Sequence, residues 1–221
     1  MVEKEYILRF LRDLRNNNSK EWMDENRERY HTMKDRWLVE IELILERLSK
    51  HNPVFQGVEP KNTIHRINHN RKFHPEKPTY KDYISCVPAG KKNREGSRFY
   101  ISVGLDESFI GGGLWRPQKE NLEKMRGAID YEGEKLKEIL NDKKLKSFYD
   151  GLSEDDQKLK TSPQNYSKDH PYLDLLNHKN LIVTKSITQE DFCSDHFIDI
   201  IEEGYLAFQS FDEFILRALS V

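Results

Sequence analysis

The chain has few cysteines and no long apolar run. Cys86 and Cys193 are isolated and have no CxxC spacing. They could pair in principle, but two reduced thiols are favoured in a cytoplasmic protein. The apolar stretch Leu38–Leu45 is short and is interrupted by Glu40 and Glu42, whereas roughly 20 apolar residues are needed to cross a bilayer. The first residues are charged, unlike a secretory signal. We therefore expect a cytoplasmic protein without membrane contact.

Motifs for nucleotide cofactors and metal ions are also missing. The run Gly111-Gly112-Gly113 has no GK[ST] ending and does not fit GxGxxG, so neither a P-loop nor a dinucleotide fingerprint is present. His65, His69 and His74 lie close in sequence, but residues four apart on a strand are separated by roughly 13 Å, too far to share an ion. We expect no cofactor and no metal.

What the sequence does contain indicates a packed interior. Hydrophobic residues make up 36% and charged residues 33%, with three Trp, ten Tyr and eleven Phe in 221 residues. This length supports one sizeable core. Because there is no repeat and no convincing linker, we expect a single domain over residues 1–221.

Apolar spacing predicts helices towards both ends and strands between them. Three helix starts are expected from Asn18 with Glu21, from Thr188 with Asp191 and from Ser210 with Glu213, and a fourth from Pro117. The predicted helical stripes are Ile7–Leu14, Tyr30–Leu48 and Leu122–Leu140; the predicted strands are Ile64–Asn68, Tyr83–Val87, Phe99–Val103 and Leu181–Val183, with an exposed connection over Pro88–Ser97. The class is α+β: an antiparallel meander packed against N-terminal and C-terminal helices.

The net charge is only −2, but it is unevenly distributed. Residues 60–100 contain ten Lys or Arg against three Asp or Glu, and residues 188–221 contain one Arg against eight acids. Such asymmetry is typical of an anion-binding face. Alternatively, acids of the C-terminal helices, such as Asp199 and Glu202, pair with the basic residues and make the chain an interaction or scaffold module.

The basic segment, residues 63–81 (TIHRINHNRKFHPEKPTYK), is the leading candidate site. Arg66, Lys72, Lys77 and Tyr80 are expected to bind a small anionic ligand, phosphorylated ligands included. Single-stranded nucleic acid on the sheet ranks below such a ligand, because the sequence pI is near 6.5 and there is no basic helix or tail.

A second part of this site is expected at Gly112 and Arg116, where a predicted strand leads into a predicted helix. Glycine allows close approach to the backbone, and a helix N-terminus attracts anions. The alternative, which the sequence favours, is that glycines are needed wherever strands bend or pack closely.

The motif RINHNRKF followed by KxxY resembles the signature R-x-x-R-D-x-R-F…K-x-x-Y of a family of uncharacterised, mostly bacterial proteins, described as conserved hypothetical or as a domain of unknown function. The blocks LRNNNSKEWMDENRERY, SFIGGGLWRPQKENLEKMR and SPQNYSKDHPYLDLLNHK are similar to blocks of that family in the same order. The resemblance covers nearly the whole chain and implies a fold and the position of a site, but no reaction.

This chain departs from the family pattern within the signature. His69, Asn70 and Lys72 stand where the family has Arg, Asp and Arg, and Asn177 stands where Arg is usual. Pro163-Gln164-Asn165 replaces Pro-Lys-Gly. An amide lacks a proton-accepting carboxylate, and lysine lacks the bidentate fork of arginine, so these departures imply an altered site.

An enzyme is the remaining alternative. His170 lies beside Asp169 and near Asp174, an arrangement that could orient an imidazole as a general base. The same Asp-His-Pro loop is equally consistent with a helix cap before Tyr172, and no nucleophile completes a triad.

Overall fold

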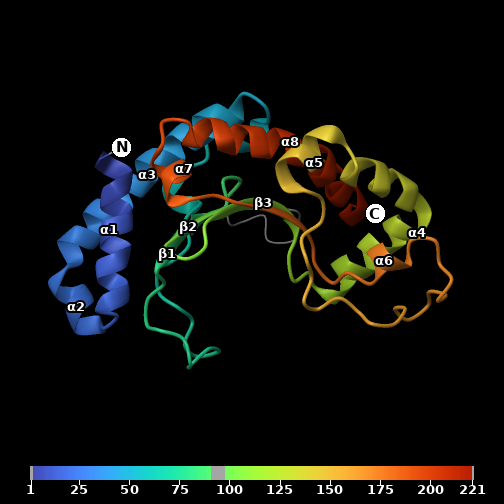
Figure 1. Ribbon diagram of the computed structural model, residues 1–221, viewed down its shortest axis with the longest axis horizontal. Coiled ribbons are helices and arrows are strands. Elements are labelled where there is room, and N and C mark those ends of the chain that lie inside the picture. The colour runs from blue at the N-terminus through green and yellow to red at the C-terminus, as the bar shows by residue number, and fades with distance from the viewer. Residues whose placement is uncertain (1, 91–97, 221) are drawn as a thin grey trace. The chain divides into compact units, whose positions relative to one another are not determined.

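The computed structural model describes residues 2–90 and 98–220 (Figure 1). Three helices come first, followed by two short 3-10 turns, three strands, three helices, a fourth strand and two final helices. Their bounds are α1 (Val2–Asn16), α2 (Lys20–Glu25), α3 (Arg27–Ser49), β1 (Tyr83–Cys86), β2 (Arg98–Gly104), β3 (Phe109–Leu114), α4 (Lys119–Leu140), α5 (Lys143–Tyr149), α6 (Leu173–Leu176), β4 (Leu181–Ser186), α7 (Gln189–Cys193) and α8 (Phe197–Leu219).

The strands form one sheet in the order β1-β2-β3-β4. β1 and β2 are antiparallel, with Tyr83 opposite Gly104 and Cys86 opposite Ile101. The three consecutive strands make the predicted meander, and β4 adds to it beside β3. The predicted α+β class is confirmed. No helix in the described part of the chain is long and apolar enough to span a membrane.

The described residues cluster into two compact units. Unit 1 comprises the described residues within Met1–Lys91, Tyr100–Ile110 and Ser186–Glu202; unit 2 comprises the described residues within Lys92–Phe99, Gly111–Lys185 and Glu203–Val221. Strands β2, β3 and β4 and helix α8 contribute residues to both units. A single domain over residues 1–221 stays a prediction.

In unit 1, the core is built by the apolar stripes that the sequence predicts. α1 packs against α3 through buried Ile7, Phe10 and Leu11, and Trp37 and Ile41 of α3 are buried as well. The start of α2 differs from the prediction: the hydroxyl of Ser19, not the side chain of Asn18, accepts the N–H of Trp22. Asn18 is used instead to bind the basic segment.

The segment predicted as strand Ile64–Asn68 is not a strand. It makes two isolated antiparallel bridges, Ile64 with Cys86 and Asn68 with Tyr80. The reason is that its pairing partner changes along its length: His65 N–H bonds to β1, whereas residues from Ile67 onwards pair with the chain just before β1. The predicted connection Pro88–Ser97 lies mostly outside the described residues.

In unit 2, the glycine run lies inside β3 and does not open a helix, because the backbone of β4 and the aromatic ring of Phe208 crowd it. A Cβ on Gly113, at φ +126°, would lie 2.2 Å from the carbonyl oxygen of Leu181. A Cβ on Gly112 would lie 2.5 Å from the ring of Phe208. Helix α4 begins only at Lys119, so the expected start at Pro117 is wrong.

The C-terminal helices are only partly as predicted. The capping box of Thr188 and Asp191 at the start of α7 is confirmed. The separate last helix capped by Ser210 is wrong, because α8 runs unbroken from Phe197 to Leu219. Within this helix Gly204 is held in place by Tyr149, whose hydroxyl donates to the Gly204 carbonyl at 2.8 Å.

Candidate functional site

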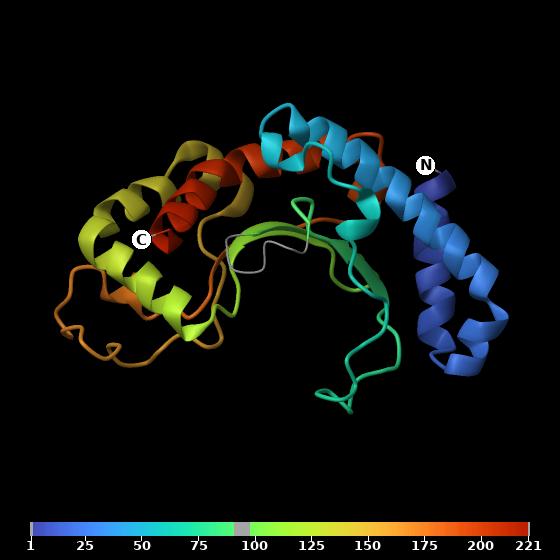
Figure 2. The same ribbon diagram turned by 180° about the vertical axis from the view of Figure 1, so that it is seen from behind.

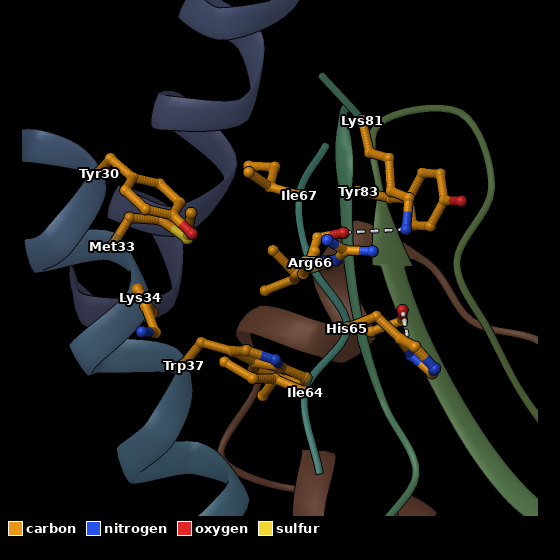
Figure 3. Close-up of a pocket in the computed structure, with 12 residues that line it drawn as sticks. Tyr30, Met33, Lys34, Trp37, Ile64, His65, Arg66, Ile67, Lys81 and Tyr83 are labelled. Atoms are coloured by element: carbon orange, nitrogen blue, oxygen red, sulfur yellow. Dashed lines mark hydrogen bonds between the residues drawn. The ribbon is translucent and has the colours of Figure 1, made fainter. Parts of the chain in front are cut away.

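Arg66 and Lys81 meet at the base of the basic segment, in unit 1. Lys81 Nζ donates to the Arg66 carbonyl at 2.9 Å and lies 5.4 Å from the centre of the Tyr83 ring. Figure 3 shows these side chains beside a small cavity whose other wall carries Tyr30 and Trp37 of α3. The cavity has a volume of about 20 Å³, room for about one water molecule. It is too small to enclose a ligand.

The same part of unit 1 carries a group of half-buried rings, which we call the aromatic face: His65, His69, Tyr83, Tyr100 and Phe109. Tyr100 stacks on Phe109 with their centres 5.6 Å apart, and His65 lies 5.7 Å from Tyr100. His69 meets Tyr83 edge-on at 6.5 Å. Tyr83 on β1 and Tyr100 on β2 are less buried than the residues that follow them in each strand, and Ser85 and Ser102, on the same side of these strands, are buried.

Two lysines bring positive charge to the aromatic face. Burial lowers the pKa of His69, and the nearby charges of Lys81 and Lys77 lower it further. His69 is therefore neutral at pH 7, with Nδ1 donating to the Pro78 carbonyl at 2.9 Å. The two ammonium groups then provide the charge beside this ring.

The remainder of the basic segment is exposed. All residues from 70 to 78 are exposed, including Phe73, which is 70% accessible. Figures 1 and 2 show this stretch as a loop that extends away from β1. Lys72 lies 6.0 Å from the centre of the Phe73 ring. Within residues 2–90 and 98–220, four cations of the segment have no carboxylate within 4 Å: Arg66, Arg71, Lys72 and Lys77.

The acids that the scaffold interpretation assigned to these cations bind elsewhere in unit 1. Arg47 Nη1 lies 2.6 Å from Asp199 and 2.7 Å from Glu202. Glu202 also contacts His51 at 2.5 Å. The hydrogen bond from His51 and then that from Arg47 lower the pKa of Glu202. The acids at the beginning of α8 are therefore neutralised by Arg47 of α3 and by His51, which follows α3.

Tyr80 differs from the other predicted ligand residues because it is only 7% accessible. Its backbone is fixed by the side chain of Asn18, whose Nδ2 donates to Tyr80 O and whose Oδ1 accepts from Tyr80 N, both at 2.9 Å. This amide pairs with the chain as a neighbouring strand residue would. Tyr80 thus anchors the end of the exposed loop to the start of α2.

In unit 2, Arg116 follows β3 with the unusual φ of +45°. Its N–H donates to Asn180 Oδ1 at 2.8 Å, and its guanidinium lies 5.2 Å from the ring of exposed Trp115. The Asn180 side chain and backbone are in turn fixed by the carboxylate of Asp155. Gly112 faces Phe208 in the core, so its role in the fold is close packing.

Both ring nitrogens of His170 are in hydrogen bonds within unit 2. Nδ1 accepts the N–H of Tyr172 at 3.1 Å, which places the proton on Nε2, 2.9 Å from a carboxylate oxygen of Asp130. Neither Asp169 nor Asp174 orients the ring. The N–H that His170 accepts belongs to Tyr172, the N-cap of α6, and α6 itself has no side-chain cap. Catalysis by His170 stays a prediction.

The predicted residues thus fall into two groups. Arg66, Lys72, Lys77 and Tyr80 belong to unit 1, and Gly112, Arg116 and His170 belong to unit 2. No group of three metal-ligating side chains that could hold an ion is found among the described residues. The sequence interpretation missed a groove in unit 1 lined by Arg9, Arg12 and Arg36. Its one sequence signal is the spacing of Arg9 and Arg12, which puts both on one side of α1.

Comparison with known proteins adds the family but no activity. The chain matches the family model described as conserved hypothetical protein (DUF2461) over residues 6–214. No curated protein and no solved structure matches it. With almost its whole length matched, the chain belongs to the DUF2461 family of conserved hypothetical proteins.

Proposed function

We propose that the basic segment and the aromatic face bind ligands that carry a phosphate group and a planar ring, namely nucleotides or short single strands of nucleic acid. The observation that carries the proposal is the set of four cations without a carboxylate partner in the described part of the chain: Arg66, Arg71, Lys72 and Lys77. Uncompensated Lys and Arg side chains attract phosphate, and charge-assisted bonds to phosphate are strong.

The aromatic face supports a planar ring as the second part of the ligand. Tyr83, Tyr100 and Phe109 are half-buried, so each is held in position and keeps part of its ring accessible. Stacking of a base on an aromatic side chain is worth about 1–3 kcal/mol and depends little on sequence. Arg66 and Lys81 lie beside Tyr83, within reach of a phosphate attached to a stacked ring.

The shape of the region favours a ligand that lies on the surface. The cavity at Arg66 holds about 20 Å³, whereas pockets that enclose small ligands measure about 300–1,000 Å³. The exposed loop around Phe73 also presents its cations outward. Open basic surfaces with aromatic rings are typical of single-strand binding, so the free nucleotide and the oligonucleotide are the two forms to compare.

Fluorescence anisotropy of a short labelled single-stranded oligonucleotide, with nucleotides and inorganic phosphate as competitors, tests the proposal. We expect binding that weakens steeply with salt, that Arg66→Ala and Lys72→Glu reduce, and that Lys50→Glu leaves unchanged. Lys50 is an exposed lysine at the end of α3 and gives the matched control. If Lys50→Glu weakens binding as much as Lys72→Glu, the interaction is non-specific and the proposal fails.

A second variant distinguishes the contribution of the planar ring of the ligand from that of its phosphate. Replacing Tyr83 by Leu keeps an apolar side chain on β1 but removes the ring. We expect oligonucleotide and nucleotide binding to fall by about 10-fold to 100-fold, as loss of one stacked base implies, with competition by inorganic phosphate unchanged. No loss for the oligonucleotide and the nucleotide, or an equal loss for all three ligands, would contradict stacking on Tyr83.

A further inference from the structure

A groove of about 890 Å³ lies in unit 1, outside the basic segment. Its walls come from α1, α3 and α7. Three arginines line it, Arg9, Arg12 and Arg36, together with Tyr6 and Cys193. Its volume lies within the range of about 300–1,000 Å³ that is usual for small-molecule sites.

Each of the three arginines contacts an uncharged group. The guanidinium of Arg36 lies 4.1 Å and that of Arg9 lies 5.2 Å from the centre of the Tyr6 ring. Arg12 Nη2 donates to Gln189 Oε1 at 3.2 Å. Stacking on an aromatic face holds a guanidinium in place and leaves the N–H groups at its edge available to a ligand.

Gln189 is itself fixed. Its Nε2 donates to the Leu105 carbonyl at 3.0 Å, so its Oε1 is the atom that faces Arg12. Gln189 is also the first residue of α7, directly after the capping box of Thr188 and Asp191. The guanidinium of Arg12 is therefore bound to a rigid acceptor.

Two of the three positive charges are not compensated by an ion pair. Arg36 is paired with Glu3 at 2.7 Å. Over the ranges that the structure describes, Arg9 and Arg12 have no carboxylate within 4 Å, although Glu5 and Glu190 also line the groove. Because Arg9 and Arg12 are three residues apart on α1, their side chains lie on the same side of this helix.

We propose that this groove is a second binding site, for a small phosphorylated molecule whose dianionic group is bound by Arg9 and Arg12. Arginine suits this role because its planar fork matches the oxygens of a phosphate and its charge is permanent. The site shares no residue with the basic segment, so it does not depend on the nucleotide proposal.

The rate at which Cys193 is alkylated measures access to the groove. It lines the groove and is partly accessible, whereas Cys86 is fully buried on β1. Burial raises the pKa of both thiols, so alkylation is best followed at mildly alkaline pH. A neutral maleimide will modify Cys193 in the folded protein, and its rate measures how open the groove is.

The experiment measures this rate with pyrophosphate and with sodium chloride at the same ionic strength. At a pyrophosphate concentration about ten times its dissociation constant, we expect the modification of Cys193 to slow roughly tenfold. The double variant Arg9→Gln/Arg12→Gln changes only exposed side chains and should lose this protection, while Lys50→Gln retains it. Circular dichroism confirms that each variant is folded.

Three outcomes overturn the proposal: no protection by pyrophosphate, equal protection in the double variant, or calorimetric binding of pyrophosphate that the double variant leaves unchanged. Arg66→Ala separates the two sites, because it should weaken the oligonucleotide and leave protection of Cys193 intact. Failure at the groove and failure at the basic segment are therefore distinguishable.

Discussion

Replacement of Asp155 by Asn tests how unit 2 holds Arg116 in its unusual backbone conformation. The Asp155 side chain is 1% accessible and accepts four hydrogen bonds. They come from Gln157 N at 3.0 Å, Lys179 N at 2.7 Å, and Asn180 N and Nδ2, both at 2.8 Å. The fixed Asn180 then accepts the N–H of Arg116.

The magnitude follows from the pKa of Asp155. Burial alone would raise this pKa, but the hydrogen bonds from Asn180, Lys179 and Gln157 outweigh burial and lower it from 3.8 to about 2. At about 1.36 kcal/mol per pKa unit, ionisation of this carboxylate contributes about 2 kcal/mol to the free energy of unfolding. Asn cannot accept at both positions, so we expect a loss of about this size at pH 7.

The pH dependence has a definite sign. Because the folded pKa is lower than the unfolded pKa, this stabilisation is complete above about pH 4 and is lost as the pH falls through about 2. Urea unfolding of the wild type and of Asp155→Asn should therefore converge between pH 4 and pH 2. The same two proteins are also compared with His178→Gln added to each. Burial lowers the pKa of His178, and protonation of this residue would add a second acid transition. A difference below about 0.5 kcal/mol at pH 7, or one independent of pH, would refute this account.

Three further predictions concern packing, capping and the thiols. Gly113→Ala should destabilise the protein by more than about 2 kcal/mol in thermal unfolding, because the new Cβ meets the backbone of β4 at a position with positive φ. Gly127→Ala in α4, which has open space around it, should instead stabilise the protein by about 0.5–1 kcal/mol. Equal effects of the two substitutions would contradict the packing argument. Thr188→Ala should cost about 1 kcal/mol through loss of the α7 cap, and Thr188→Ser should restore most of it. Mass spectrometry after alkylation of the native protein should find one modified thiol, at Cys193; modification of Cys86 at the same rate would show that β1 opens readily.

The elements that local patterns specify could be predicted from the sequence. The long helix α3 follows from its apolar spacing, and the cap of Thr188 on α7 follows from hydroxyl and carboxylate three residues apart. Where the prediction failed, contacts between residues that are distant in sequence determine the structure. Ser210 has the pattern of a cap, but it lies within α8 because Phe208 and Phe211 on either side are buried in one continuous stripe.

The two candidate sites also differ in whether the sequence alone predicts them. The basic segment is visible in sequence because its cations lie within one stretch of 19 residues, 63–81. The groove is not, because Arg9, Arg36 and Gln189 are distant in sequence and come together only when α1, α3 and α7 pack. The role of Asn18 was missed for the same reason: its side chain resembles a cap, yet it bonds to Tyr80 far along the chain.

Charge compensation explains why both proposed sites lie in unit 1. The acids of early α8 face Arg47 and His51, so they are already neutralised and leave the cations of the basic segment without partners in the described chain. At the groove, Tyr6 contacts Arg9 and Gln189 binds Arg12, and neither arginine has a carboxylate within 4 Å in the described chain. A carboxylate would cancel the charge of the guanidinium it binds, whereas a ring or an amide does not. When neutral groups position an arginine or lysine, its positive charge stays available. Such a site fits a ligand that carries the missing negative charge.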